Sequence, residues 1–149
     1  SLGPGSGVRL RNWWRLAIAT EAVGTMSAAL DQTVAYLKER RQFGRAIASF
    51  QAVQHRLADC AVRVEGSRWL VYEAAYKHAP EEATACAAAY ALESARQVFR
   101  ETHQLSGAIG FTREHDLHVW SMRLQALGIE LSGAAGHRRA VAAARWGSP

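Results

Sequence analysis

The chain has 149 residues, long enough for one domain with a buried core, and it carries 18 Lys and Arg against 13 Asp and Glu, a net charge of +5. No apolar run reaches the roughly 18 residues that a membrane-spanning helix needs, so the sequence predicts no membrane span. The arginines are scattered, without interleaved aromatic residues or the spacing of a helix-turn-helix or zinc finger, which argues against nucleic acid as a partner. An excess of basic over acidic residues is also typical of proteins that bind small phosphate-rich ligands.

The composition favours helices over strands. Hydrophobic residues make up 49% of the chain, alanine is abundant and only 3 prolines are present, and alanine is the best helix former while proline is the worst. The two cysteines, Cys60 and Cys86, each lie in an apolar helical pattern and are interpreted as reduced, buried thiols. Because no apolar signal segment is visible at the start, we expect a cytoplasmic protein.

Residues 1–9 begin with a Gly-, Pro- and Ser-rich stretch, which is typical of a linker or a cloning remnant. The folded domain is expected over residues 10–146. Its first helix should run from about Leu10 to Arg41, because apolar and small residues recur there at alternating spacings of three and four. The resulting stripe consists of Leu16, Ala19, Val23, Met26, Leu30, Thr33 and Leu37.

Three further long helices and one short helix are predicted downstream. Their expected ranges are Phe50–Lys77, Glu81–Leu105, Glu114–Gly128 and Ala134–Arg145. Ser49 is the expected N-cap of the second helix, and Thr112, Glu114 and Asp116 are expected to cap the fourth. No strand pattern is visible. Long amphipathic helices with short connections predict an all-α, up-and-down four-helix bundle with a short extra C-terminal helix.

The connection between the first two helices is a basic elbow. Arg40 and Arg41 are expected in the last turn of the incoming helix, where cations suit the negative end of the helix dipole. Gly44 follows where the chain must turn, and glycine tolerates the left-handed conformation that ends many helices. Gln51 is expected just inside the next helix. Free backbone N–H groups beside arginines make this elbow a candidate phosphate site.

Two motifs in this order resemble the acyl-CoA dehydrogenase family. The first is R-x-x-F-G-x-x-x-x-x-x-Q, formed by Arg40, Phe43, Gly44 and Gln51, and it resembles the elbow between the first two helices of that family's C-terminal domain. The second, His103–Asp116, resembles the family's Q-x-x-G-G-x-G-[FY]-x-x-E loop between the third and fourth helices. The resemblance covers about residues 12–145.

This resemblance implies contacts with the FAD of a neighbouring subunit. The residues at the matching positions are Arg40, Gln42, Phe43 and Gln51 in the elbow and Gln104, Gly107, Ala108 and Gly110 in the second loop. Glycines in that loop would let the backbone approach the diphosphate. Ala108 replaces the second glycine of the family's pair, and alanine fits only where φ is negative. The alternative for both stretches is an ordinary connection between helices.

The family's reaction also needs a carboxylate base, which removes the proton α to a thioester while the flavin takes the β-hydride. Counting along the family's motifs places Leu131 at one usual base position and Trp14 at the other. Both residues are apolar. Glu130, one residue from the first position, is the nearest candidate for a catalytic base. The resemblance therefore implies a domain without a base of its own unless Glu130 serves.

A metal site or a nucleophile has little support. Glu114, His115, Asp116 and His118 cluster near the start of a predicted helix, but a di-iron site in a bundle needs E-x-x-H on two helices. Leu117 stands where that histidine should be. The cluster is interpreted as capping and surface polar groups, and no metal is expected. No local pattern indicates a Ser-His-Asp or Cys-His nucleophile.

The resemblance implies the C-terminal domain of an FAD-dependent acyl-CoA dehydrogenase of fatty acid metabolism, which acts on an acyl-CoA thioester only within a fuller chain or complex. A complete member also has an N-terminal helical domain and a middle β-domain, which hold much of the flavin and the acyl-CoA. We expect a homodimer or tetramer through the bundle, or a hetero-oligomer with a catalytic subunit. The alternative is a non-catalytic helical interaction module that has lost the flavin.

Overall fold

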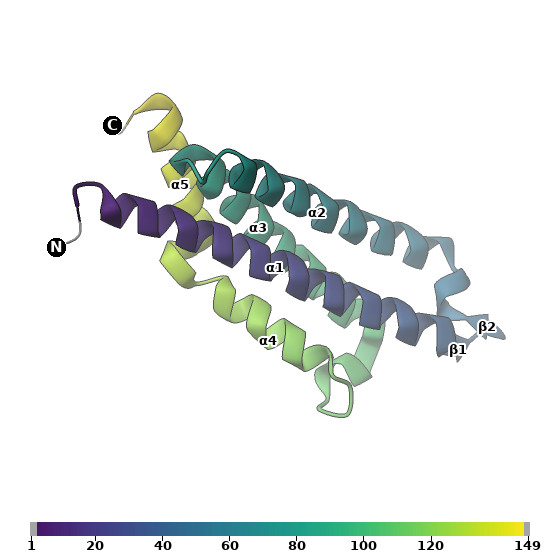
Figure 1. Ribbon diagram of the computed structural model, residues 1–149. Helices are drawn as coiled ribbons and strands as arrows, with labels where there is room; N and C mark the ends of the chain where they lie inside the picture. Colours follow the sequence, from purple (N-terminus) through teal and green to yellow (C-terminus); the bar gives the residue numbers. More distant parts are fainter. Residues whose placement is uncertain (1–2, 148–149) are drawn as a thin grey trace.

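A computed structural model describes residues 3–147, and over this range it contains five α-helices and one short β-hairpin (Figure 1). The predicted all-α bundle is confirmed. The helices are α1 (Ser6–Glu39), α2 (Gln51–Tyr76), α3 (Glu81–Ser106), α4 (Leu117–Leu127) and α5 (Gly133–Trp146). The hairpin of β1 (Arg41–Gln42) and β2 (Arg45–Ala46) lies at one end of the bundle, and α5 and both chain ends lie at the other.

The observed helices differ from the expected ranges mainly at the first residues of α1 and α4. Helix α1 begins at Ser6 rather than at Leu10, so it extends into the expected linker at residues 1–9, of which residues 1–2 lie outside the described chain. Helix α4 begins at Leu117 rather than at Glu114, because a 3-10 turn over Gly107–Phe111 and a further bend precede it.

The core lies between α3 and the helices around it. Every residue of the stripe predicted on α1 is buried. Helix α3 contacts α1, α2, α4 and α5, and its buried alanines, such as Ala87, Ala88 and Ala91, let these helices approach closely. Cys60 and Cys86 are both free, Cys60 buried and Cys86 half-buried. Burial raises the pKa of the Cys60 thiol to about 11, so this thiol stays protonated.

The expected side-chain caps are wrong. Helix α2 starts one residue later than Ser49 would require, with Phe50 at the N-cap, and the Ser49 hydroxyl donates to the Ala46 carbonyl oxygen at 2.7 Å. Asp116 occupies the N-cap of α4 but makes no side-chain capping hydrogen bond. The Thr112 hydroxyl donates to the Ile109 carbonyl oxygen at 3.0 Å instead. These hydroxyls stabilise the turns before the helices rather than the helix ends.

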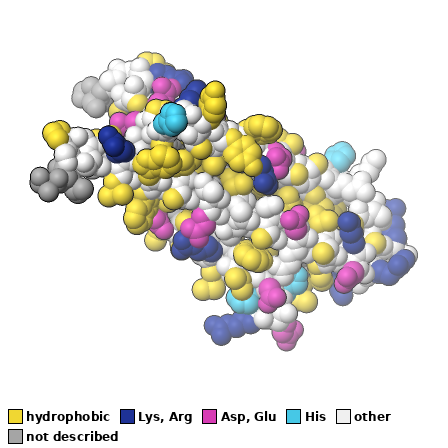
Figure 2. Space-filling model, viewed as in Figure 1, with side chains coloured by type: hydrophobic (Ala, Val, Ile, Leu, Met, Phe, Trp, Pro, Cys, Tyr) yellow, Lys and Arg dark blue, Asp and Glu magenta, His cyan; other side chains and the backbone are white. Residues whose placement is uncertain are grey.

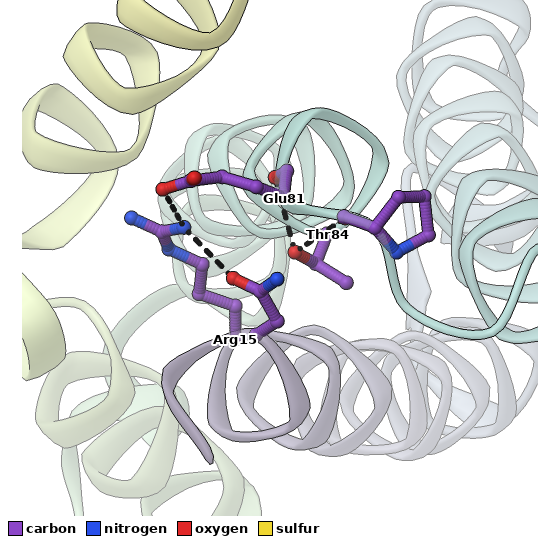
Figure 3. A network of polar contacts seen from close by, with 5 residues as sticks. Arg15, Glu81 and Thr84 are labelled. Carbon is purple, nitrogen blue, oxygen red and sulfur yellow. Dashed lines mark hydrogen bonds and ion pairs between the residues drawn. The ribbon is translucent and has the colours of Figure 1, made fainter. Parts of the chain in front are cut away.

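A buried polar network ties the starts of α1 and α3 together (Figure 3). Arg15 is 6% exposed, and its Nη1 lies 3.3 Å from Glu81 Oε1 and 3.3 Å from Asn12 Oδ1. The Thr84 hydroxyl lies 3.1 Å from the Glu81 carbonyl oxygen. His137 of α5 is also buried, and both burial and the charge of Arg15 lower the pKa of its imidazole. The buried Arg15 thus lies close enough to His137 for its charge to favour the neutral form of that imidazole.

The outer face of α2 carries exposed apolar side chains, namely Val62, Trp69, Tyr72 and Tyr76. Three of them, at 62, 69 and 76, are spaced by seven residues and so form one stripe along the helix. Within the described residues, no helix is both long enough and apolar enough to cross a membrane.

Candidate functional site

The elbow between α1 and α2 is a β-hairpin, which the sequence did not predict. Arg41 pairs with Ala46 and Gln42 with Arg45 in an antiparallel ladder. Phe43 (φ 53°) and Gly44 (φ 78°) form the turn, and positive φ at both central residues is the mark of a type I′ hairpin turn. Gly44 therefore serves a hairpin rather than the end of a helix.

The two arginines of the elbow lie beyond α1, contrary to expectation. Arg40 is the C-cap of the helix and has extended backbone (φ −67°, ψ 120°), and Arg41 is already in β1. The Ile47 N–H donates to the Arg40 carbonyl oxygen at 2.8 Å, which closes the base of the hairpin. Gln51 is the first residue of α2, as predicted, and is exposed.

The second predicted loop begins where α3 ends. Gly107 has φ 66° and ψ −147°, a backbone conformation that only glycine adopts readily. Ala108 does not have a positive φ, so alanine fits there without strain. A Cβ on Gly110 would lie 2.9 Å from the Ser106 Cβ. Gly110 is buried and thus allows the loop to pack closely on Ser106 at the end of α3.

A polar cluster anchors this loop to α1. The Trp120 indole N–H donates to Gln32 Oε1 at 2.9 Å, and Gln32 Nε2 lies 3.4 Å from His115 Nδ1. The same His115 nitrogen accepts the Leu117 N–H at 3.3 Å. The Tyr36 ring meets the His115 ring edge-on, with centroids 5.4 Å apart. His115, interpreted from sequence as a surface polar group, is in fact a structural contact between the loop and α1.

The elbow and the second loop meet at one groove of about 390 Å³. Arg40 lines it from the elbow, and Gly107 and Ala108 line it from the loop. Gln104 lies in another groove of about 430 Å³, which is lined by Arg56 of α2, by residues of α3 and by Phe111 of the loop. The structure thus brings three of the predicted site residues together. Gln42, Phe43 and Gln51 are exposed on or beside the hairpin.

Positive charge gathers at the hairpin end of the molecule (Figure 2). Among the described residues, neither Arg40 nor Arg41 makes an ion pair, whereas Arg123 pairs with Glu21 and Arg138 with Glu93. Two guanidinium groups without carboxylate partners are available to an anion at this end.

His103, next to Gln104, is a buried imidazole. Its ring packs between Phe99 and Phe111, with centroids 4.5 and 4.8 Å away, and neither of its nitrogens has a hydrogen-bond partner within the described chain. Burial, together with the charge that His115 can carry, lowers the pKa of this imidazole. A neutral ring in an aromatic stack is a packing residue rather than a proton carrier.

The predicted base positions lie at the opposite end of the bundle. The Trp14 indole N–H donates to Glu130 Oε2 at 2.9 Å. Leu131 has left-handed backbone (φ 47°, ψ 41°) and is 41% exposed. Trp14 and Arg40 are separated by about 39 Å along α1, at 1.5 Å per residue. Glu130 and the groove beside Arg40 therefore lie at opposite ends of the bundle.

The fold of this chain matches that of a known enzyme domain. The family model for the acyl-CoA dehydrogenase C-terminal domain matches residues 9–146. The chain therefore belongs to the acyl-CoA dehydrogenase family and corresponds to its C-terminal domain.

Individual relatives give the same result. Acyl-CoA dehydrogenase IpdE2 of Mycolicibacterium smegmatis is 42% identical over 109 residues, which are 72% of this chain and 34% of that protein. The ChsE4–ChsE5 complex of Mycobacterium tuberculosis superposes with a TM-score of 0.92 at 29% identity, covering 99% of this chain and 41% of that one. PigA, solved with FAD and proline, superposes with a TM-score of 0.81 at 27% identity, covering 88% of this chain and 35% of that one. This chain thus spans about a fifth to two-fifths of the length of the relatives it matches.

Proposed function

We propose that this domain lends phosphate and backbone contacts to an FAD held largely by a neighbouring subunit of an acyl-CoA dehydrogenase assembly. The observation that carries the proposal is the shared groove: Arg40 and the Gly107–Ala108 backbone lie 67 residues apart in the sequence yet line one space. A guanidinium without a carboxylate partner and a loop open at Gly107, where an added Cβ would meet nothing within 4 Å, suit an approaching diphosphate.

The residues at this end have distinct tasks. Arg40 would neutralise phosphate charge, and the Gly107–Ala108 backbone would bring the chain close to the same group. Gln42, Phe43 and Gln51 would contact the dinucleotide from the hairpin side. Gln104 would reach it from the second groove. Gly110 would keep the loop packed on α3. Bound FAD would accept the hydride in the α,β-dehydrogenation of an acyl-CoA thioester.

The domain contributes no catalytic base in this proposal. Leu131 and Trp14 carry no carboxylate, and Glu130 is already engaged by the Trp14 indole. A base must reach the proton it removes within hydrogen-bond distance. The flavin contacted by Arg40 would therefore meet a base from another subunit, and this chain would act as the partner of a catalytic subunit.

Assembly through the bundle is part of the proposal. The outer face of α2, with exposed Val62, Trp69, Tyr72 and Tyr76, is the kind of apolar surface that marks a protein contact. A homodimer or tetramer would cover it, and so would a hetero-oligomer. The ChsE4–ChsE5 relative is itself a complex of two proteins, which favours the hetero-oligomer for a chain without a base.

The second candidate function is a helical interaction module that no longer meets the flavin. Trp14 and Leu131 at the base positions, and Ala108 in place of a glycine, favour it. The structure weakens the last of these points, because Ala108 does not have the positive φ that would demand glycine.

Replacing Arg40 by Gln in the complete assembly separates the two candidates. The dissociation constant of FAD, followed by the fluorescence of released flavin, should rise about tenfold, as for a lost charged hydrogen bond. The oligomer mass should stay the same. Arg139→Gln, on the exposed face of α5, is the matched charge control. Equal flavin affinity in both variants would leave the interaction module as the function.

A further inference from the structure

One aromatic ring holds two side chains of the hairpin in place. The Arg45 guanidinium carbon lies 3.9 Å from the centroid of the Phe50 ring. The Phe43 ring meets the same Phe50 ring edge-on, with centroids 6.1 Å apart and an interplanar angle of 84°. Phe50 thus presents its face to a cation, as cation–π pairs require, and also contacts a second ring.

The place of Phe50 is fixed by the backbone around it. Phe50 is half-buried at the N-cap of α2. Its N–H donates to the Ile47 carbonyl oxygen at 3.2 Å, and its own carbonyl oxygen accepts the N–H groups of Val53 and Gln54, both at 3.0 Å. The ring therefore projects from the start of a helix, while Phe43 of the turn and Arg45 of β2 pack against it.

Phe43 has a backbone conformation that needs such support. Its φ of 53° is unusual for a bulky residue, and its side chain is 89% exposed. Strained backbone of this kind persists where the surroundings fix it, and it concentrates at functional sites. The ladder fixes the backbone, and the Phe50 ring gives the exposed Phe43 side chain a contact within the chain.

We propose that Phe50 is a positioning residue that presents Arg45 and Phe43 to the dinucleotide of the neighbouring subunit. Arg45 would thereby join Arg40 as a second cation for the phosphates. Among the described residues Arg45 makes no ion pair, so its charge is directed by the ring alone. This inference rests on the proposed FAD contact and adds to it a residue outside the resemblance, Arg45, with the group that orients it.

The test measures FAD affinity in the complete assembly for Phe50→Leu, Phe50→Tyr, Arg45→Gln and the double variant Phe50→Leu/Arg45→Gln. Phe50→Leu and Arg45→Gln should each weaken FAD about two- to fivefold, the range of an exposed cation–π contact. The loss in the double variant should be smaller than the product of the two single losses, because the part of the Phe50 effect that acts through Arg45 is already absent in Arg45→Gln. Phe50→Tyr should bind as the parent does, since the ring remains.

Two controls make the outcome decisive. Arg41→Gln removes a charge from β1, where, within the described residues, no aromatic ring lies under the guanidinium. Any loss of FAD affinity that it causes should be the same with Phe or Leu at position 50. Amide hydrogen exchange at the start of α2 checks that Phe50→Leu still folds locally. The positioning role would be overturned if the losses of FAD affinity in the two single variants multiplied in the double variant, or if Phe50→Leu bound FAD as tightly as the parent. If Arg40→Gln were also unchanged, the proposed FAD contact itself would fail.

Discussion

The Trp14 indole N–H donates a 2.9 Å hydrogen bond to the Glu130 carboxylate, and this contact joins the two places where a family member would carry its base. Trp14 stands at one of them, and Glu130 is adjacent to Leu131 at the other. The carboxylate nearest to a catalytic position is therefore used to tie the loop before α5 to α1. The contact gives Glu130 a structural task that needs no proton transfer.

Glu130→Gln tests this assignment directly. Because an amide oxygen can still accept from the indole, the variant should fold normally, and turnover of the complete assembly should not change. Loss of a general base lowers turnover about 10²- to 10⁴-fold, so a drop of that size would identify Glu130 as the base. Trp14→Phe is the companion variant, because it removes the donor and leaves the carboxylate.

The buried Arg15 makes Glu81 important for stability. Glu81→Gln would leave the guanidinium without a countercharge, and we expect the free energy of unfolding to fall by about 1–2 kcal/mol, since Glu81 is partly exposed. The matched control is Glu73→Gln, which breaks an exposed pair with Lys77 on α2 and should cost less than about 0.5 kcal/mol. Urea denaturation measures the free energy of unfolding of both variants. Equal losses would show that the burial of Arg15 has no energetic consequence.

The stability of the protein should fall in weak acid. Burial lowers the pKa of His137 and of His103 in the folded state below the usual 6.5. The unfolded chain therefore binds protons first as the pH drops, so stability is full above about pH 6.5 and is lost progressively below it, towards and through the lowered folded values. His137→Gln should flatten this dependence when the free energy of unfolding is measured from about pH 5 to pH 8. An unchanged slope would rule out His137 as its source.

Gain of a methyl group at Gly107 should destabilise the protein more than loss of one at Ala108. Gly107→Ala forces an L-residue into φ 66°, ψ −147° and should cost about 1–3 kcal/mol. Ala108→Gly restores the family's glycine pair at a residue without positive φ and should cost less than about 1 kcal/mol, through chain entropy. Thermal unfolding of the two variants checks the order. The reverse order would contradict the positive φ of Gly107.

The helices were predictable because apolar residues recur at helical spacing along each of them. The α1 stripe from Leu16 to Leu37 recurs at helical spacing, and each of its members is buried. Cys60 was correctly taken for a buried thiol for the same reason. The meeting of Arg40 with the Gly107 loop was expected only through the resemblance, since nothing in the spacing of two remote loops says that they share a groove.

The hairpin and the helix starts could not be read from periodicity. Two paired residues on each side of Phe43 and Gly44 are too few for an alternating pattern, and a phenylalanine at positive φ contradicts ordinary turn preferences. Ser49 has the right chemistry for an N-cap, but its hydroxyl bonds to Ala46, a choice that local sequence does not reveal. His115 depends on Gln32 and Tyr36, about 80 residues away, so its role is set by tertiary packing.

The length of α1 has a consequence for protein engineering. The hairpin lies at one end of this helix and the Trp14–Glu130 contact lies near the other, about 39 Å away along the axis. Sites so far apart that share no contact residue usually have additive effects on stability. Substitutions at Arg45 and at Trp14 can therefore be optimised separately and then combined, and their free-energy changes should sum.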